Sequence, residues 1–293
     1  MIKIAHIVNQ VNVNKSSDLF EAQPVTFRTM LAAKKFCAQE GVVNLYAVGY
    51  EEDRAIIPNG FEALPNLLKS VMDFGRFNNF RKLPLIGEIL DSCRNLDVDY
   101  IIYANVDIAL QPYFYNYILE KIQNGSDSLI INRRIIDTIS SDVMMYSKVG
   151  QKHPGYDCFV FKKDLLNKFE FGNVCIGANW IGRIFYSNLL ILSNSLEVVE
   201  DAHLTFHIGE DGAWVQEKFS EFDLHNEEEV KRIIKKQLIK YKDNKEFVIK
   251  LNKVLSQIND WGKSNVLKDL TKDKKNRLKI PFKVKQFIKL FFK

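Results

Sequence analysis

The sequence lacks the features that mark membrane-spanning, secreted and zinc-binding proteins. No stretch of its 293 residues reaches about 20 uninterrupted apolar positions, so we expect no segment to cross a bilayer. The apolar run at residues 1–8 is too short to form a signal peptide. The four cysteines lie far apart and form no Cys-x-x-Cys pair, which favours reduced, buried thiols over disulfides or zinc. Together these absences predict a cytoplasmic protein.

Excess positive charge is also missing from most of the chain. Residues 263–293 contain eleven lysines and arginines against two aspartates, a net charge of +9. The other 262 residues carry 30 basic and 34 acidic groups, a net charge of −4. Nucleic-acid phosphates require a basic face, which this mildly acidic body lacks. We therefore expect no nucleic-acid partner.

What the chain does contain is a regular order of apolar segments. Residues 2–8 and 42–49 are predicted strands, and a predicted helix over 24–37 separates them, which is the spacing of a parallel β-α-β unit. Further helices are predicted over 84–93 and 112–123. With 46% hydrophobic residues, the chain can bury a full core. The fold class predicted is α/β, with a mostly parallel central sheet flanked by helices.

Two local signals define the second half of the predicted fold. Residues 153–157 form a His-Pro-Gly cluster that predicts a turn, from which a strand over 158–161 emerges. Asn226 followed by three glutamates predicts a helix N-cap with acids that complement the helix dipole. This long helical stretch runs to about residue 261, with an interruption near 242–244.

The chain is organised around the apolar stretch 100–108, which ends in Asn105-Val106-Asp107. A strand that carries a carboxylate at its carboxyl end places it at the edge where open α/β sheets bind ligands. Asn105 and Asp107 are two residues apart, so both can face one crevice. This is the leading candidate for a metal and diphosphate site. The alternative is an aspartate that only caps a turn or the next helix.

The second element is His203-Leu-Thr-Phe-His207. Strand alternation predicts His203, Thr205 and His207 on one face. A late histidine beside acids can complete a divalent-metal site begun by Asp107, because Mg²⁺ and Mn²⁺ prefer carboxylate and phosphate oxygens and Mn²⁺ also accepts imidazole. The alternative for either histidine is a structural role in a polar cleft.

This layout resembles the GT-A glycosyltransferases, which use nucleotide sugars as donors. Their Asp-x-Asp motif at the end of a central strand would correspond to Asn105–Asp107, and their late histidine ligand best matches His207. Residues 154–161 are similar to the strand that lines the acceptor and sugar pocket. The resemblance covers roughly residues 1–215 and implies a GT-A-like (Rossmann-like) fold with Mn²⁺ or Mg²⁺ held by Asp107 and His207. Asn105 departs from the motif because it contributes no charge.

The resemblance also implies candidate roles for further residues. Breaking a sugar–nucleotide bond builds negative charge on a diphosphate, which a cation must meet. An acceptor hydroxyl in an inverting reaction also needs a carboxylate general base, for which Asp157 is the first choice and Asp201, Glu210 and Asp211 are alternatives. For ring stacking, the candidates are Tyr156, Trp180 and Trp214. The predicted donor-binding residues are Asn9, Arg76, Arg81, Lys82, Asn105 and Asp107. The basic members of that set are alternatively solvated surface charges.

The carboxyl-terminal part of the chain predicts an appendage. We expect a catalytic domain over 1–222, helices packed on it over 223–262 and a basic amphipathic tail over 263–293. In helical projection the aromatic residues near the end of the tail gather opposite its lysines, which suits an anionic membrane surface. The alternative is a helix packed on the body or on another subunit. Membrane attachment would place the protein at the inner face of the cell membrane. It would also suggest a glycan or lipid-linked acceptor in bacterial surface polysaccharide or lipopolysaccharide assembly.

Two other function classes stay open. A sugar-phosphate nucleotidyltransferase would also use a strand-end acid and a metal. It normally needs a glycine-rich basic loop after its first strand, whereas residues 9–18 contain no glycine and only Lys15. A non-catalytic carbohydrate-binding protein on a degenerate transferase fold would explain Asn105 in place of an acid.

Overall fold

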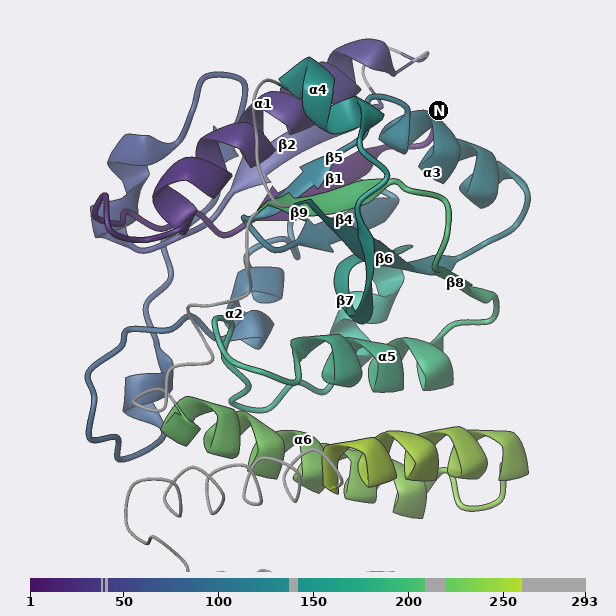
Figure 1. Cartoon of the computed structure of the whole chain (residues 1–293). Coiled ribbons are helices and arrows are strands. Elements are labelled where there is room, and N and C mark those ends of the chain that lie inside the picture. Colours follow the sequence, from purple (N-terminus) through teal and green to yellow (C-terminus); the bar gives the residue numbers. More distant parts are fainter. Residues whose placement is uncertain (38, 40–41, 137–141, 209–219, 260–293) are drawn as a thin grey trace, which may run out of the picture.

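The computed structural model describes residues 1–37, 39, 42–136, 142–208 and 220–259, which form a mixed α/β sheet covered by helices on both faces (Figure 1). The strands are β1 (Ile4–Val8), β2 (Val43–Ala47), β3 (Glu62–Ala63), β4 (Tyr100–Ala104), β5 (Ile108–Leu110), β6 (Ser128–Ile136), β7 (Gln151–Lys162), β8 (Leu196–Val199) and β9 (Thr205–Ile208). The α-helices are α1 (Leu19–Phe36), α2 (Ile86–Asp91), α3 (Phe114–Gln123), α4 (Asp142–Ser147), α5 (Ile181–Leu192) and α6 (Ser220–Lys240). Short 3-10 helices are η1 (Glu51–Ile56), η2 (Val71–Asp73) and η3 (Lys163–Lys168). A further helix covers residues 245–259 and is called the 245–259 helix.

The sheet confirms the predicted α/β class. Its strand order is β3-β2-β1-β4-β7-β6-β9-β5. Strand β8 pairs with the first half of β6, and β9 pairs with the second half. The pairs β1–β2, β1–β4, β2–β3, β6–β8 and β6–β9 are parallel, whereas β7 runs antiparallel to both β4 and β6, and β5 antiparallel to β9. Every residue of β1 and β4 is buried, as expected for parallel strands that are covered on both faces.

Alternation along the strands divides the core into layers. Ile101 and Tyr103 of β4 face a cluster that includes α2, α5, α6 and the 245–259 helix, while Ile102 and Ala104 face a cluster with α1 and α3. In Figure 1, α1, α3 and α4 cover one face of the sheet and α2, α5 and α6 the other. The carboxyl end of β4 lies between these two layers, at the edge of the sheet.

The predicted turn at residues 153–157 is wrong, because β7 continues through it. The β6–β7 pairing extends from Ser128↔Phe161 to Ile135↔Gln151 and absorbs its irregularities at two register shifts around Asn132. Bulges of this kind interrupt the hydrogen-bonded ladder locally and leave the extra residues unpaired, while the pairing resumes on either side of the His-Pro-Gly sequence. Asp157 therefore lies within a strand of the sheet.

The predicted alternation from His203 to His207 holds only in part. His203 precedes β9 and adopts a left-handed backbone conformation with φ of 48°, so it is not on the strand face with Thr205 and His207. Its Nε2 lies 3.3 Å from the Gln111 amide, and the Tyr113 hydroxyl donates to its carbonyl at 2.9 Å. His203 thus holds the turn that leads into β9.

The predicted N-cap at Asn226 is also wrong, because α6 begins six residues earlier, at Ser220. Asn226 is fully buried, and its amide bonds the backbone of Cys175 in both directions, at 2.9 and 2.8 Å. It also donates to the carbonyl of Asn179 at 2.9 Å. Asn226 therefore makes tertiary hydrogen bonds to the segment before α5 and does not cap the helix. The predicted interruption near 242–244 is confirmed by the turn between α6 and the 245–259 helix.

The two carboxyl-terminal helices share the core of the sheet. Val230, Ile233 and Ile234 of α6 and Leu251, Val254 and Ile258 of the 245–259 helix belong to the same buried cluster as Ile101 and Tyr103. The division at residues 222 and 262 stays a prediction, and the predicted tail lies outside the described residues.

All four thiols are free, with Cys93, Cys158 and Cys175 buried and Cys37 partly exposed.

Within the described segments, no helix has both the length and the apolar content needed to cross a bilayer.

Candidate functional site

Polar side chains from four parts of the sheet meet beyond the carboxyl end of β4. We call this set the Asp107 cluster; its members are Asn105, Asp107, Arg133, His153, Asp157 and His207. Asn105 and Asp107 occupy the turn between β4 and β5, Arg133 lies on β6, His153 and Asp157 on β7, and His207 on β9. The cluster thus joins chain segments that are about 100 residues apart in sequence.

Asp107 and His207 are in direct contact. Oδ2 of Asp107 lies 3.3 Å from Nε2 of His207, and the two side chains are 24% and 8% exposed. The contact follows from the antiparallel register of β5 and β9, which places Ile108 opposite His207. Oδ1 of Asp107 has no hydrogen-bond partner among the described residues and is buried. The structure therefore brings together the two predicted metal ligands, with one carboxylate oxygen left over.

Asp157, the predicted general base, lies beside the predicted Asp-x-Asp segment. The Asn105 backbone donates to the Asp157 carbonyl at 3.3 Å, and the Asn105 amide donates to Oδ1 of Asp157 at 3.4 Å. The Tyr103 hydroxyl donates to the other end of the Asn105 amide at 3.3 Å. An aspartate at position 105 would face the Asp157 carboxylate with like charge, so the amide suits this contact. Asn105 holds Asp157 in place.

Two members of the cluster were not predicted from the sequence. Arg133 is only 5% exposed; its guanidinium lies 3.4 Å from Oδ1 of Asp157 and 3.3 Å from Nε2 of His153. The His153 ring in turn lies 3.9 Å from Oδ2 of Asp157. The sequence offers only a weak signal for Arg133, an arginine that directly continues a buried apolar strand; Arg134 follows it immediately and is a more exposed alternative.

Burial and these contacts together shift the pKa values of the two carboxyls in opposite directions. Burial raises the pKa of Asp107, but the hydrogen bond and charge of His207 and the charge of Arg133 outweigh it, so the pKa lies below its ordinary value. Burial raises the pKa of Asp157 above its ordinary value, although Arg133 and His153 act against this, and the Asp107 charge raises it further. Two carboxyls with opposed pKa shifts are suited to different roles.

The cluster fits a divalent cation as a partial site. Asp107 and His207 supply an oxygen and a nitrogen to one point, and the buried Oδ1 of Asp107 still needs a partner. In the part of the chain that the structure describes, no three His, Cys, Asp or Glu side chains surround a common metal position. Mg²⁺ commonly binds through one or two protein carboxylates and takes its other ligands from water and substrate phosphates. A cation held by Asp107 and His207 would therefore take its other ligands from water and a bound diphosphate.

The predicted donor-binding residues outside the cluster lie in several places. Asn9 follows β1, is buried, and donates to the Val48 carbonyl at 2.6 Å. Arg81 lies over the Phe222 ring of α6, and burial lowers its pKa. Lys82 pairs with Glu52 at 2.6 Å and lies over the Tyr50 ring. Arg76 is exposed on the surface. These contacts tie Arg81 and Lys82 to α6 and η1.

The alternative bases and stacking residues are also dispersed. Asp201 is 75% exposed and lies 3.5 Å from Lys152, while Glu210, Asp211 and Trp214 fall outside the described residues. Tyr156 is adjacent to Asp157 on β7, stacks on Tyr186 and lies under the Arg183 guanidinium. Trp180 is partly buried against the core at the start of α5, with φ of 83°. Of the two predicted rings that the structure describes, Tyr156 is the one adjacent in sequence to a member of the cluster.

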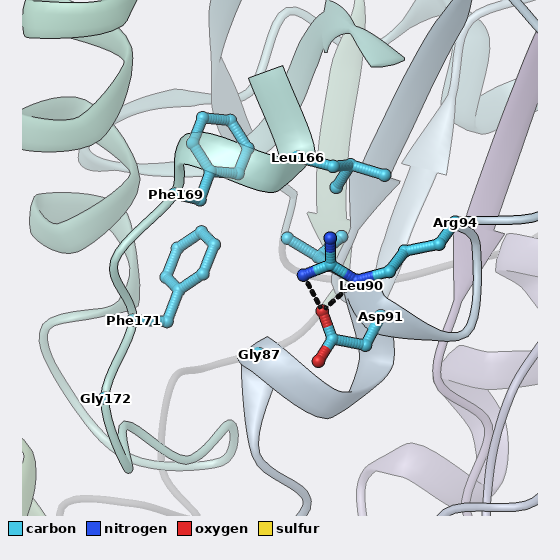
Figure 2. A pocket seen from close by; sticks show the side chains of 8 residues that line it. All are labelled: Gly87, Leu90, Asp91, Arg94, Leu166, Phe169, Phe171 and Gly172. Carbon is cyan, nitrogen blue, oxygen red and sulfur yellow. Dashed lines mark hydrogen bonds and ion pairs between the residues drawn. The ribbon is translucent and has the colours of Figure 1, made fainter. Parts of the chain in front are cut away.

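A small cavity lies elsewhere, between α2 and η3 (Figure 2). It measures about 140 Å³, and none of its lining residues belongs to the Asp107 cluster. Figure 2 shows Arg94 turned toward Asp91, to which it donates at 2.9 and 2.6 Å, with Phe169 and Phe171 opposite. The charged groups of this cavity therefore already satisfy each other.

Comparison with solved structures gives matches of low sequence identity. The crystal structure of S. aureus TarS 1–349 in complex with UDP-GlcNAc is 12% identical, with 81% of this chain and 73% of that chain covered and a TM-score of 0.48. A Bacillus anthracis protein assigned as a glucose-1-phosphate thymidylyltransferase, in complex with sucrose, is 10% identical, with 75% and 95% covered and a TM-score of 0.43. No family model matches the sequence, and no curated protein matches it.

Proposed function

We propose that this protein is a glycosyltransferase that moves a sugar from a nucleotide-sugar donor to an acceptor hydroxyl. The observation that carries the proposal is the contact between Asp107 and His207 at the carboxyl end of β4, with Asp157 beside them. This edge of an open α/β sheet is where ligands bind. The lowered pKa of Asp107 keeps this carboxylate charged, so that it can hold a cation for the diphosphate leaving group. The raised pKa of Asp157 suits proton transfer.

Asp157 is suited to act as the general base. Its Oδ2 accepts no hydrogen bond from any described residue, while Asn105 and Arg133 hold Oδ1. In the proposed step the acceptor oxygen bonds to the anomeric carbon and its proton passes to Asp157. The bond from that carbon to the diphosphate oxygen breaks, and the electron pair leaves with the nucleoside diphosphate. A raised pKa brings the base closer to the operating pH, which favours proton transfer.

Asp107 and His207 would hold Mn²⁺ or Mg²⁺, which when bound neutralises charge on the diphosphate. A cation is needed electrostatically, because the fixed charges of Asp107, Asp157 and Arg133 sum to −1 when both carboxyls are ionised, and a diphosphate adds more negative charge. The protein residues alone would repel the donor.

The acceptor that we propose is a glycan or lipid-linked sugar in bacterial surface polysaccharide assembly. This part of the proposal is supported by the sequence of residues 263–293, whose net charge of +9 and aromatic residues suit an anionic membrane surface. A membrane-bound transferase would meet a lipid-linked acceptor at that surface.

The proposal is tested with a panel of nucleotide sugars, by measuring release of nucleoside diphosphate with and without Mn²⁺. We expect Asp107→Asn and Asp157→Asn to lower turnover by about 100-fold or more, since each removes a charged group that acts on the transition state. Asp97→Asn is the matched control, because Asp97 is 92% exposed and pairs with Lys3 on the surface. The thermal midpoint of each variant checks folding.

Three results would overturn the proposal. The first is unaltered turnover in Asp107→Asn. The second is the absence of both binding and turnover for every donor in the panel, which would favour a non-catalytic carbohydrate-binding protein. The third is formation of a nucleotide sugar and pyrophosphate from a sugar phosphate and a nucleoside triphosphate, which would identify a nucleotidyltransferase.

A further inference from the structure

The outer surface of the two carboxyl-terminal helices carries an unusual concentration of unpaired lysines. Residues 231–253 contain nine lysines and arginines and two acids, a net charge of +7. The first half of α6 is different, because residues 220–229 contain five acids and no lysine or arginine. Charge is therefore separated along α6, and the basic part continues through the turn into the 245–259 helix.

Within this segment, the same pattern appears on both helices. Lys235, Ile239 and Lys242 are spaced by four and three residues, and Lys245, Ile249 and Lys253 by four and four. Lys235 and Ile239 therefore lie on one stripe of α6, and Lys245, Ile249 and Lys253 on one stripe of the 245–259 helix, while Lys242 lies in the turn between the two helices. The two isoleucines are 75% and 69% exposed, and the four lysines are exposed as well. We call these six residues the basic face.

The basic face points away from the body. In α6 the buried residues Val230, Ile233, Ile234 and Gln237 lie on the side opposite Lys235 and Ile239. In the 245–259 helix, Leu251, Val254 and Ile258 are buried opposite Ile249. Both buried sides belong to one core cluster, so both stripes face outward from it. Figure 1 shows α6 and the yellow helix that follows it at the bottom of the molecule, beyond α5.

The lysines of the basic face are not neutralised within the protein. Neighbouring cations do have partners: Lys231 pairs with Glu227, Lys236 with Glu170 and Lys250 with Glu246. None of the four lysines of the basic face forms an ion pair with any residue that the structure describes. An exposed apolar side chain between two such lysines on each helix gains nothing from water.

We propose that the basic face binds an anionic lipid surface. Four free ammonium groups match the charge of acidic lipid headgroups, and two isoleucines on the outermost stripes can enter the headgroup layer while the lysines stay at its surface. Two helices whose buried sides share one core cluster present this arrangement on their outer surfaces, which suits an extended partner.

Other occupants fit less well. A second copy of the same face would bring two +7 segments together, and residues 263–293, with a net charge of +9, would also be repelled. Nucleic-acid surfaces favour arginine and stacking aromatic rings between their basic residues, whereas this face carries lysine and isoleucine. Charge complementarity and the aliphatic residues together favour a membrane.

The test uses the full chain and measures its partition onto phosphatidylcholine vesicles with and without phosphatidylglycerol. In the fourfold variant Lys235→Gln, Lys242→Gln, Lys245→Gln and Lys253→Gln we expect partition onto the anionic vesicles to fall by about 100-fold or more, at about fivefold per lysine near the surface. The matched control changes four exposed lysines elsewhere: Lys35→Gln, Lys69→Gln, Lys162→Gln and Lys168→Gln. Both variants have the same net charge, so a difference between them reports position.

A second variant, Ile239→Ser with Ile249→Ser, probes insertion of the apolar side chains. We expect it to weaken the binding that persists at high salt, where charge attraction is screened. Equal loss in the fourfold variant and its control would overturn the proposal, as would wild-type protein that ignores phosphatidylglycerol. Preferential retention on an oligonucleotide instead of on vesicles would overturn it as well. Circular dichroism and the thermal midpoint establish that every variant folds.

Discussion

At the residue scale, the Asp107 cluster depends on one buried cation. Arg133 is the buried positive charge of the cluster, and its charge acts to lower the pKa of both carboxyls, although burial keeps the pKa of Asp157 above its ordinary value. Without it, two carboxylates would share a buried site with only histidines nearby. Arg133 was not predicted, yet it is the side chain that makes this arrangement electrostatically tolerable.

Replacing Arg133 with methionine should destabilise the protein in a pH-dependent way. Removal of one partner from a buried pair costs about 3–5 kcal/mol. Because the loss of Arg133 raises the pKa of Asp157 further in the folded state, the cost is smallest at low pH, where Asp157 is protonated. The loss of stability grows as the pH rises, because the Asp157 carboxyl ionises in the unfolded chain but is costly to ionise in the folded variant. Urea unfolding across acidic to neutral pH measures this. Arg134→Met is the control, since Arg134 bonds backbone carbonyls of a surface turn, and equal pH profiles would contradict the assignment.

His6 on β1 makes a separate pH prediction. It is fully buried, its Nδ1 lies 2.9 Å from the Tyr115 hydroxyl, and burial lowers its pKa to about 3. Below its unfolded pKa the unfolded chain binds a proton that the folded chain refuses. As the pH is lowered from about 6 to about 4, the free energy of unfolding should therefore decrease by about 1.4 kcal/mol per pH unit. His6→Gln should remove this part of the slope; parallel slopes for variant and wild type would show that His6 does not titrate this way.

At the scale of elements, strands and helices form where local patterns predict them, but their ends depend on tertiary contacts. The α6 helix illustrates this, because its first residues Phe222 and Asn226 are buried against the segment before α5. Those contacts extend the helix beyond the local capping signal at residue 226. The helix start is therefore a property of packing.

Asn226→Ala should show which contact decides the role of this residue. The change leaves the buried N–H and C=O of Cys175 without partners, and each buried unpaired group costs about 1–3 kcal/mol. We expect a total loss of about 2–6 kcal/mol in the free energy of unfolding by urea. The loss of a helix N-cap alone would cost only about 1 kcal/mol, so a value of that size would favour the capping role.

At the scale of the whole molecule, the described chain has one continuous core on the α5 side of the sheet. Apolar side chains from β4, α5, α6 and the 245–259 helix contact one another within it. The helices after residue 220 are therefore part of the support for the sheet that carries the Asp107 cluster. Their outer surface carries the basic face.

A chain that ends at residue 219 should not fold cooperatively. It would lose Phe222, Val230, Ile233, Ile234, Leu251, Val254 and Ile258, all of them 3% exposed or less. Burial of each such side chain contributes about 1.5–3 kcal/mol, and the sum exceeds the net stability of a typical domain. A chain that ends at residue 259 keeps all seven and is the matched control. Both are compared by thermal unfolding; a sharp transition in the shorter chain would mean that residues 1–219 are an independent domain.

Local sequence determined the alternating core strands, the helices between them and the position of Asp107 at the end of β4. These features follow from hydrophobic periodicity and the reach of a few residues, which is why they could be predicted. The continuation of β7 through residues 153–157, the turn at His203 and the role of Asn226 could not be predicted, since each depends on partners outside the local segment: β6 for β7, Tyr113 for His203 and Cys175 for Asn226. Only the tertiary structure decided that Arg133 and His153 join the predicted residues Asp107, Asp157 and His207, because strand register is set by pairing across the whole sheet.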